Sequence, residues 1–407
     1  MSTSNWYNEI ETSIANLTTK GLLKAFDKFE GADKEVISNL FVKKIEKNKN
    51  FRPLVFFVGY CIAKGGKLLK IDSLSNEEKD LIGDITAAIE VENIATYYIN
   101  HYIDQKGDIK DKQDEKNRVL AGVMCRNIQQ SIIENLSLEL ELKSEIIRLL
   151  KEIDQDIAKA QIFEVNTGIF SKIDEFSDES KFLEIYFERC RKISGQFYGR
   201  SAEIGYVVGA RSIKETEDKR KIEQLYTEMI TLLQYSNDIG DYAPPTMHSG
   251  TVEKNFYKDY GSDFKNQRLT YPNYLLLKRA KSETDKKFIE VVLKKGFTDK
   301  NIVKFIKLMN KYNVLSDCFT LLNHNFNKEK KKLWLPESEL RTLISSSIII
   351  VRSNKLLTSV KQLITHSTRS LGSEAFTPSP SASEPRQKFN LSISEKLFRW
   401  GGIKKKK

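Results

Sequence analysis

The sequence predicts an all-α protein, and three observations lead to this expectation. Chain-breaking residues are scarce, with 8 prolines and 20 glycines in 407 residues. Pro378, Pro380 and Pro385 fall in one late segment, so the rest of the chain contains few breakers. Long stretches place apolar residues at intervals of three and four, as amphipathic helices require. We find no convincing run of the alternating pattern that is typical of strands.

The helical spacing recurs along the chain in segments that short polar residues often precede. Ser75, Ser177 and Asp299 lie at or just before segment starts, where such side chains cap helices. In chain order, the expected helices are 35–49, 76–102, 117–135, 143–161, 178–210, 213–238, 285–295 and 299–325. Repeated long helices favour a single bundle around a central cavity.

Composition argues against several classes of protein. No apolar run approaches the roughly 18–20 residues of a membrane-spanning helix, and the polar, acidic start of the chain argues against a secretory signal. The 4 cysteines are scattered, which predicts buried free thiols in a reducing cytoplasm. The net charge of +11 lacks a basic stripe interleaved with aromatics. We therefore expect a cytoplasmic protein with phosphate ligands or an acidic surface as partner, and no nucleic acid.

The end of the chain differs in character from the rest. We expect a helical bundle over residues 1–365, a Ser/Pro-rich linker over 366–387 and an apolar-basic docking peptide over 388–407. The peptide joins Phe, Leu, Ile and Trp residues to four terminal lysines. That combination suits an anionic membrane surface or a groove on a protein assembly. A frayed terminus with no role is the alternative.

Residues 234–241 place two amides and two carboxylates at helical offsets of three, four and seven. The four side chains, Gln234, Asn237, Asp238 and Asp241, would therefore share one helix face. Oxygen ligands of this kind suit Mg²⁺ bridged to a phosphorylated substrate. For the two carboxylates, an ordinary solvated face is the alternative.

Other short stretches, together with residues 234–241, resemble motifs of the trans-isoprenyl diphosphate synthase (polyprenyl synthetase) family. Residues 49–54 resemble its Gly-Lys-x-x-Arg-Pro segment, and residues 100–104 fall where its first Asp-Asp-x-x-Asp motif is expected. Residues 234–241 take the place of its second motif, Gln-x-x-Asp-Asp-x-x-Asp. Further matches, in chain order, are 88–96, 117–122, Lys192, Lys258, 261–263, 267–272 and 335–352. Their order over residues 40–355 carries the resemblance, and the terminal peptide lies beyond it.

The resemblance implies an all-α bundle in which two Asp-rich helices face each other across a deep pocket. It implies Mg²⁺ as cofactor, with ligands at Asn100, Asp104, Asn237, Asp238 and Asp241. It implies catalytic roles for Lys192, Gln234 and Asp238. The implied substrate-binding residues are Lys258 and Arg268 at the diphosphate, and Lys49, Arg52 and Asn93 in the pocket for isopentenyl diphosphate.

The first motif departs from the family pattern. Of its three carboxylates only Asp104 remains; Asn100 and His101 precede it, and imidazole is a poor match for Mg²⁺. The arginine pair expected shortly afterwards is missing. In the second motif Asn237 replaces a carboxylate, and in the isopentenyl pocket Asn93 stands where a histidine is expected.

These departures leave two functions open. One is a divergent Mg²⁺-dependent enzyme acting on allylic prenyl diphosphates, either by prenyl transfer to isopentenyl diphosphate or by ionisation and cyclisation as in a terpene synthase. The other is a catalytically silent homologue that regulates an active synthase as its partner. We expect a homodimer or a heterodimer with a related synthase. The terminal peptide would dock this protein on a membrane or within a larger assembly.

Overall fold

The computed structural model describes residues 3–27, 51–103, 112–168, 173–242, 261–297 and 299–332, and these contain helices and no strands. The all-α expectation is confirmed for this part of the chain. The elements, in order, are α1 (Thr3–Phe26), α3 (Phe51–Ala63), η1 (Ile71–Ser73), α4 (Asn76–Ile103), α5 (Lys112–Glu134), α6 (Leu140–Asn166), η2 (Ile173–Glu175), α8 (Glu179–Cys190), the π-helix η3 (Arg191–Gly195), α9 (Gln196–Ala210), α10 (Glu217–Gly240), α12 (Ser262–Lys265), α13 (Tyr271–Arg279), α14 (Glu283–Lys295), α15 (Asp299–Lys311) and α16 (Val314–Lys330).

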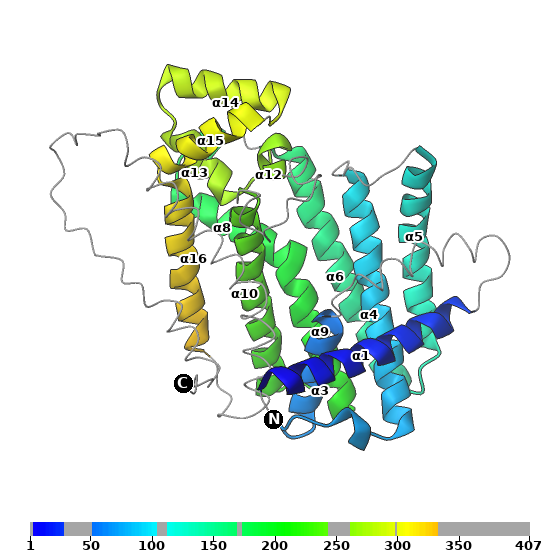
Figure 1. Cartoon of the computed structure of the whole chain (residues 1–407). Coiled ribbons are helices and arrows are strands. Elements are labelled where there is room, and N and C mark those ends of the chain that lie inside the picture. Colours follow the sequence, from blue (N-terminus) through cyan, green and yellow to red (C-terminus); the bar gives the residue numbers. More distant parts are fainter. Residues whose placement is uncertain are drawn as a thin grey trace.

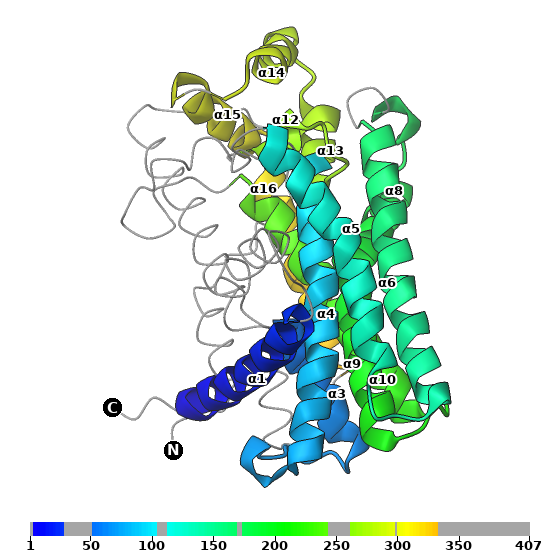
Figure 2. The same ribbon diagram turned by 90° about the vertical axis from the view of Figure 1, so that its right-hand side faces the viewer.

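The long helices run side by side as a bundle, and α1 crosses over α3 and α4 near one end (Figure 1). The short helices α12 to α15 gather at the opposite end, where α4 and α10 finish (Figure 1). In the perpendicular view, α5, α6 and α8 form one side of the bundle (Figure 2). The C-terminal ends of α4 and α10 therefore lie at one end of the molecule.

Glycines let the central helices approach each other closely. A Cβ built on Gly205 of α9 would lie 1.9 Å from the Phe56 carbonyl oxygen of α3, and one on Gly59 would lie 2.0 Å from the Ala202 carbonyl oxygen. Between α9 and α10, a Cβ on Gly199 would lie 2.0 Å from Thr227 Oγ1. Backbone contact of this kind is open only to glycine, so α9 packs tightly between α3 and α10.

Two clusters of buried apolar residues form the core. The larger joins α1, α3, α4, α5, α6, α9 and α10 from Ile222 to Leu233. The second lies around the end of α10, with α8, α13 and α16, and is rich in rings. There Phe182 stacks on Tyr274 with centroids 4.0 Å apart, and Tyr186 meets Tyr235 edge-on at 5.6 Å. This aromatic cluster surrounds the buried polar groups described below.

Most expected helices are present, with differences at their ends. Ser75 Oγ accepts a hydrogen bond from Glu78 N at 3.1 Å, and Ser75 N donates one to the Glu78 carboxylate, so the predicted cap is confirmed. The cap predicted at Ser177 is wrong by one residue, because Asp178 accepts the bond from Ser180 N at 2.8 Å. The expected helix 35–49 lies outside the described residues.

Two expected helices are each divided in the structure. The π-helix Arg191–Gly195 interrupts 178–210, and Asn313 in the left-handed region (φ 53°) separates α15 from α16. Both α1 and α3 were missed. Helix α3 is buried along most of its length, so it carries no polar stripe for periodicity to detect.

All four cysteines are buried and free, as expected. Of the helices described, none has the length and apolar character needed to cross a bilayer.

The glycine contacts predict a stability effect. We expect Gly205→Ala to lower the free energy of unfolding by roughly 1–3 kcal/mol, because the new methyl group would overlap the Phe56 carbonyl and force α3 and α9 apart. Gly122→Ala on α5 is the control, since its methyl group would come no nearer than 3.3 Å to the Ile99 side chain and 3.5 Å to the Ala95 carbonyl oxygen. Urea unfolding of both variants measures the difference, and equal stabilities would contradict close packing of α3 on α9.

Candidate functional site

The four site residues predicted at the end of α10 do not share one environment. Asp238 is buried, with 4% of its surface exposed, whereas Asn237 points to solvent. Gln234 and Asp241 are half-buried. The helical offsets do place Gln234, Asp238 and Asp241 along one side of α10, but Asn237 lies apart from them. The polar side of α10 therefore contains three of the four residues that the sequence predicted for it.

Three side chains donate hydrogen bonds to the Asp238 carboxylate. Tyr186 Oη and an Arg189 guanidinium nitrogen, both from α8, contact Oδ2 at 2.8 and 2.5 Å. Gln234 Nε2 contacts Oδ1 at 2.9 Å. Both carboxylate oxygens are thus engaged within the protein, and the Arg189–Asp238 contact is an ion pair between side chains that are 3% and 4% exposed.

Arg189 bridges two carboxylates. Its second partner is Glu164 of α6, so one guanidinium joins α6, α8 and α10. Burial alone would lower the pKa of Arg189, but the charges of Asp238 and Glu164 outweigh it and hold the pKa well above its ordinary value. Burial, reinforced by the charge of Asp238, raises the pKa of Tyr186. The tyrosine therefore stays protonated and acts as a hydrogen-bond donor.

The polar contacts continue from α6 to the altered first motif on α4. The side-chain oxygen of Asn100 accepts a hydrogen bond from Gln161 Nε2. Gln161 lies one turn before Glu164 on α6, on the same side of the helix. The two predicted halves of the metal clamp, on α4 and α10, are therefore linked through α6 by protein side chains alone.

The π-helix brings further polar groups to α10. Ser194 Oγ donates to Gln234 Oε1 at 2.8 Å. Lys192 Nζ lies 3.2 Å from Glu188, and its side chain is about one-third exposed, at 34%. Gly195 lies directly against α10, since a Cβ there would come 2.4 Å from Thr231 Oγ1. An inserted π turn commonly marks a functional position in a helix, and here it sets Ser194 against Gln234 of α10, while Lys192 pairs with Glu188 of α8.

Asp241 is held by the start of α12. Its oxygens accept hydrogen bonds from Ser262 Oγ and Asp263 N, each at 2.9 Å. Burial is the main cause that raises the pKa of Asp241 to about 6; the two hydrogen bonds oppose it, and the charge of Asp238 adds to it. Arg268, expected at the diphosphate, pairs with Asp263 at 3.1 Å. Like Asp238, Asp241 has protein donors on both oxygens.

The residues expected in the isopentenyl pocket bind separate partners. The Arg52 guanidinium lies over the rings of Phe197 and Tyr198, at 4.4 and 4.7 Å from their centroids. Asn93 Nδ2 donates to Glu90 on its own helix at 2.9 Å. The remaining predicted residues, Lys49, Asp104 and Lys258, lie outside the described residues, as does the side chain of His101.

The donor set fits Mg²⁺ in chemistry but not in arrangement. Carboxylate and amide oxygens are its usual protein ligands. Within the described ranges, however, no three His, Cys, Asp or Glu side chains converge as a metal site would require. Asp238, Asp241 and Asn100 each accept hydrogen bonds from protein groups instead. The described side chains do not form an open magnesium site.

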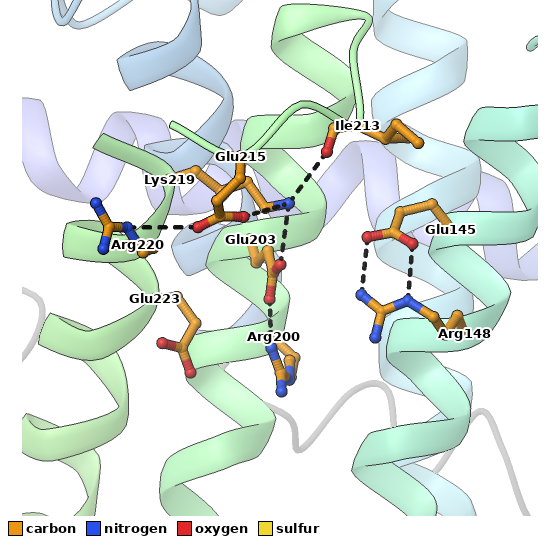
Figure 3. A pocket seen from close by; sticks show the side chains of 9 residues that line it. All are labelled: Glu145, Arg148, Arg200, Glu203, Ile213, Glu215, Lys219, Arg220 and Glu223. Atoms are coloured by element: carbon orange, nitrogen blue, oxygen red, sulfur yellow. Dashed lines mark hydrogen bonds and ion pairs between the residues drawn. The ribbon is translucent and has the colours of Figure 1, made fainter. Parts of the chain in front are cut away.

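A second polar region lies at the other end of α10 (Figure 3). It is a cavity of about 410 Å³ in which acidic and basic side chains alternate, among them the buried pair Lys219 and Glu203, 3.4 Å apart. Lys219 and Asp238 are separated by roughly 28 Å along the helix axis at 1.5 Å per residue. The cavity is therefore distinct from the polar end of α10, and its ion pairs join α6, α9 and α10.

Sequence reasoning missed several residues of this site. Arg189, Glu164 and Tyr186 belong to no stretch that resembles a family motif, and each reads as an ordinary residue of an amphipathic helix. A signal was nevertheless present, because Arg189 stands on the apolar side of the segment 178–190, beside Cys190 and one turn from Tyr186. A charged residue at such a position needs a buried partner.

Comparison with known proteins gives matches among solved structures. No protein-family model and no curated protein sequence matches the chain. Decaprenyl diphosphate synthase from Rhodobacter capsulatus aligns at a TM-score of 0.62 and 17% identity, over 88% of this chain and 99% of that one. Polyprenyl synthase from Caulobacter crescentus CB15, complexed with calcium and isoprenyl diphosphate, aligns at 0.62 and 16%, over 89% and 98%.

Geranylgeranyl pyrophosphate synthase from Corynebacterium glutamicum, complexed with isoprenyl diphosphate and magnesium, is also similar. It aligns at a TM-score of 0.61 and 15% identity, over 82% of this chain and 98% of that one. At these low sequence identities, the TM-scores establish similarity of fold. The expectation from the sequence motifs is thereby confirmed: the chain has the all-α fold of the trans-isoprenyl diphosphate synthases.

Proposed function

We propose that this chain binds an allylic prenyl diphosphate in its helical bundle and acts in prenyl-transfer chemistry. The observation that carries the proposal is the polar end of α10, where Gln234 and Asp238 lie beside the π-helix that bears Lys192. The same fold holds isoprenyl diphosphate in the Caulobacter crescentus and Corynebacterium glutamicum proteins. A lysine on an inserted turn suits recognition of a diphosphate, because a cation forms charge-assisted hydrogen bonds with phosphate oxygens.

Lys192 is the side chain best suited to meet the diphosphate. It is partly exposed, and Glu188, with which it forms an ion pair, is itself 46% exposed. A pair at the surface is weak, so a polyanionic ligand can take the lysine from it. The Ser194–Gln234 hydrogen bond would fix the position of the turn that carries this lysine. Since Asp238 and Asp241 are engaged by protein donors, the expected Mg²⁺ dependence forms no step of this proposal.

A second function is favoured by one specific observation. Both oxygens of Asp238 and the oxygen of Asn100 are occupied by protein donors, which suits a catalytically silent homologue that assists an active synthase. Exposed apolar side chains on α5 and α6 offer a surface for such a partner or for a second copy: Leu120, Val123, Ile162 and Val165 are each more than half exposed. These two helices lie next to each other on one side of the bundle (Figure 2).

Binding of the ligand can be measured directly. We expect the full chain to bind a non-hydrolysable prenyl thiodiphosphate in calorimetry, and Lys192→Gln to weaken that binding about tenfold, or about 1.4 kcal/mol, through loss of the charge. Lys151→Gln, which neutralises an exposed lysine on α6, should bind as the unmodified chain does. Absence of binding by the unmodified chain would contradict the proposed function.

A turnover assay distinguishes the two proposed functions, a prenyl-transfer enzyme and a catalytically silent partner. The enzyme releases pyrophosphate when the purified chain, Mg²⁺, an allylic diphosphate and isopentenyl diphosphate are combined, and Asp238→Ala with Asp241→Ala abolishes that release. The silent partner gives no release alone but changes the product lengths of an added active synthase. Turnover that persists in the double variant would contradict the role given to the end of α10.

A further inference from the structure

We propose that Arg189 takes the place of a metal ion at Asp238, so that this half of the site is closed to divalent cations by an internal guanidinium. The inference rests on the proposed function for the identity of the site. It goes beyond the proposed function by naming the group that neutralises the charge of Asp238. The supporting observations are the geometry of the carboxylate, the charges around it and the burial of Arg189.

Protein donors occupy three of the roughly four acceptor positions of the Asp238 carboxylate, including both on Oδ2. Arg189 and Tyr186 donate to Oδ2, and Gln234 donates to Oδ1 from the preceding turn of α10. Mg²⁺ demands near-octahedral geometry at about 2.0–2.1 Å from its ligands. An ion at that distance from Oδ2 would have to displace the guanidinium, whose nitrogen lies 2.5 Å away.

The charges around Asp238 also disfavour a divalent ion at this position. Arg189 faces Glu164 as well as Asp238, so one cation already serves both carboxylates. A divalent ion bound at Asp238 would sit against this guanidinium as a like charge, in a site where water screens little.

Arg189 cannot vacate the site by losing its proton, because a guanidinium stays charged in proteins. It cannot move freely either, since its side chain is 3% exposed and lies 5.3 Å from the Tyr186 ring. Leaving Asp238 would strand a buried charge. The closed arrangement is therefore the resting state of the described protein.

Asn100 of the first motif is also held by a protein side chain. Glu164, which holds Arg189, lies one turn from Gln161, which holds Asn100. One side of α6 thus contacts Asn100 directly, through Gln161, and Asp238 indirectly, through Glu164 and Arg189. Asp238 acts as a structural counter-ion that positions Gln234 and Tyr186, and not as a ligand.

The test uses the full chain and Mn²⁺ alone, without prenyl diphosphate, followed by electron paramagnetic resonance titration. We expect Asp238→Asn to leave the Mn²⁺ affinity unchanged within about twofold, because Asp238 is not a ligand. Arg189→Gln should create a site that binds at least about tenfold more tightly, the scale on which the surroundings of a site alter metal affinity. The double variant Arg189→Gln, Asp238→Asn should lose that gain.

Arg148→Gln is the matched control. It removes an arginine from an ion pair with Glu145 at the far cavity and should leave Mn²⁺ binding unaltered. An Asp238→Asn chain that loses tenfold or more in Mn²⁺ affinity would overturn the proposal, because Asp238 would then be a ligand with Arg189 present.

Crystals of the unmodified chain grown with Mn²⁺ give a readout that needs no variant. Anomalous density bonded to Asp238 would overturn the proposal, and an intact Arg189–Asp238 contact with no metal on Asp238 would support it. Neither measurement involves a prenyl ligand. A chain that fails to bind prenyl diphosphate would contradict the proposed function and leave the metal result standing.

Discussion

The buried ion pair between Arg189 and Asp238 is the constraint on which the rest of the site depends. A guanidinium and a carboxylate with almost no exposure are stable in a protein interior only when each has further partners. Glu164 provides one for Arg189, and Tyr186 and Gln234 provide others for Asp238. Because these partners come from α6, α8 and α10, satisfying one pair of charges fixes the relative positions of three helices.

The positions of neighbouring elements follow from this arrangement. Gln234 is oriented by Asp238, and its other end accepts the Ser194 hydroxyl. That contact holds the π-helix against α10, where Gly195 leaves space for Thr231. At the next turn of α10, Asp241 anchors α12 through Ser262 and Asp263. A helix end that could have carried open metal ligands is instead used to assemble one end of the bundle.

The fold could be predicted from the sequence because its signals are local and repeated. Helical spacing gave most of the long helices, and the order of short motifs gave the isoprenoid-synthase bundle. Helix α3 escaped detection because it is apolar on all sides. The π-helix escaped because a one-residue insertion at Arg191 to Gly195 leaves the apolar pattern of 178–210 nearly intact.

The candidate site was only partly predictable. The sequence placed Gln234, Asp238 and Asp241 along one side of a helix, and the structure agrees. It could not show that Asp238 is neutralised from within, because the responsible residue lies 49 positions earlier on another helix. Nor could it show that Gln161 meets Asn100 from a position 61 residues away. Contacts between distant helices depend on packing, which no single motif records.

A double-mutant cycle on Arg189 and Asp238 tests the central claim most directly. The free energies of unfolding in urea are measured for the unmodified chain, Arg189→Met, Asp238→Asn and the double variant. We predict a loss of about 3–5 kcal/mol for each single variant, since each strands a buried charge or its partners. The loss in the double variant should be smaller than the sum of the two single losses by at least about 2 kcal/mol. Losses that simply add would contradict the account, because they would mean that the two side chains do not depend on each other.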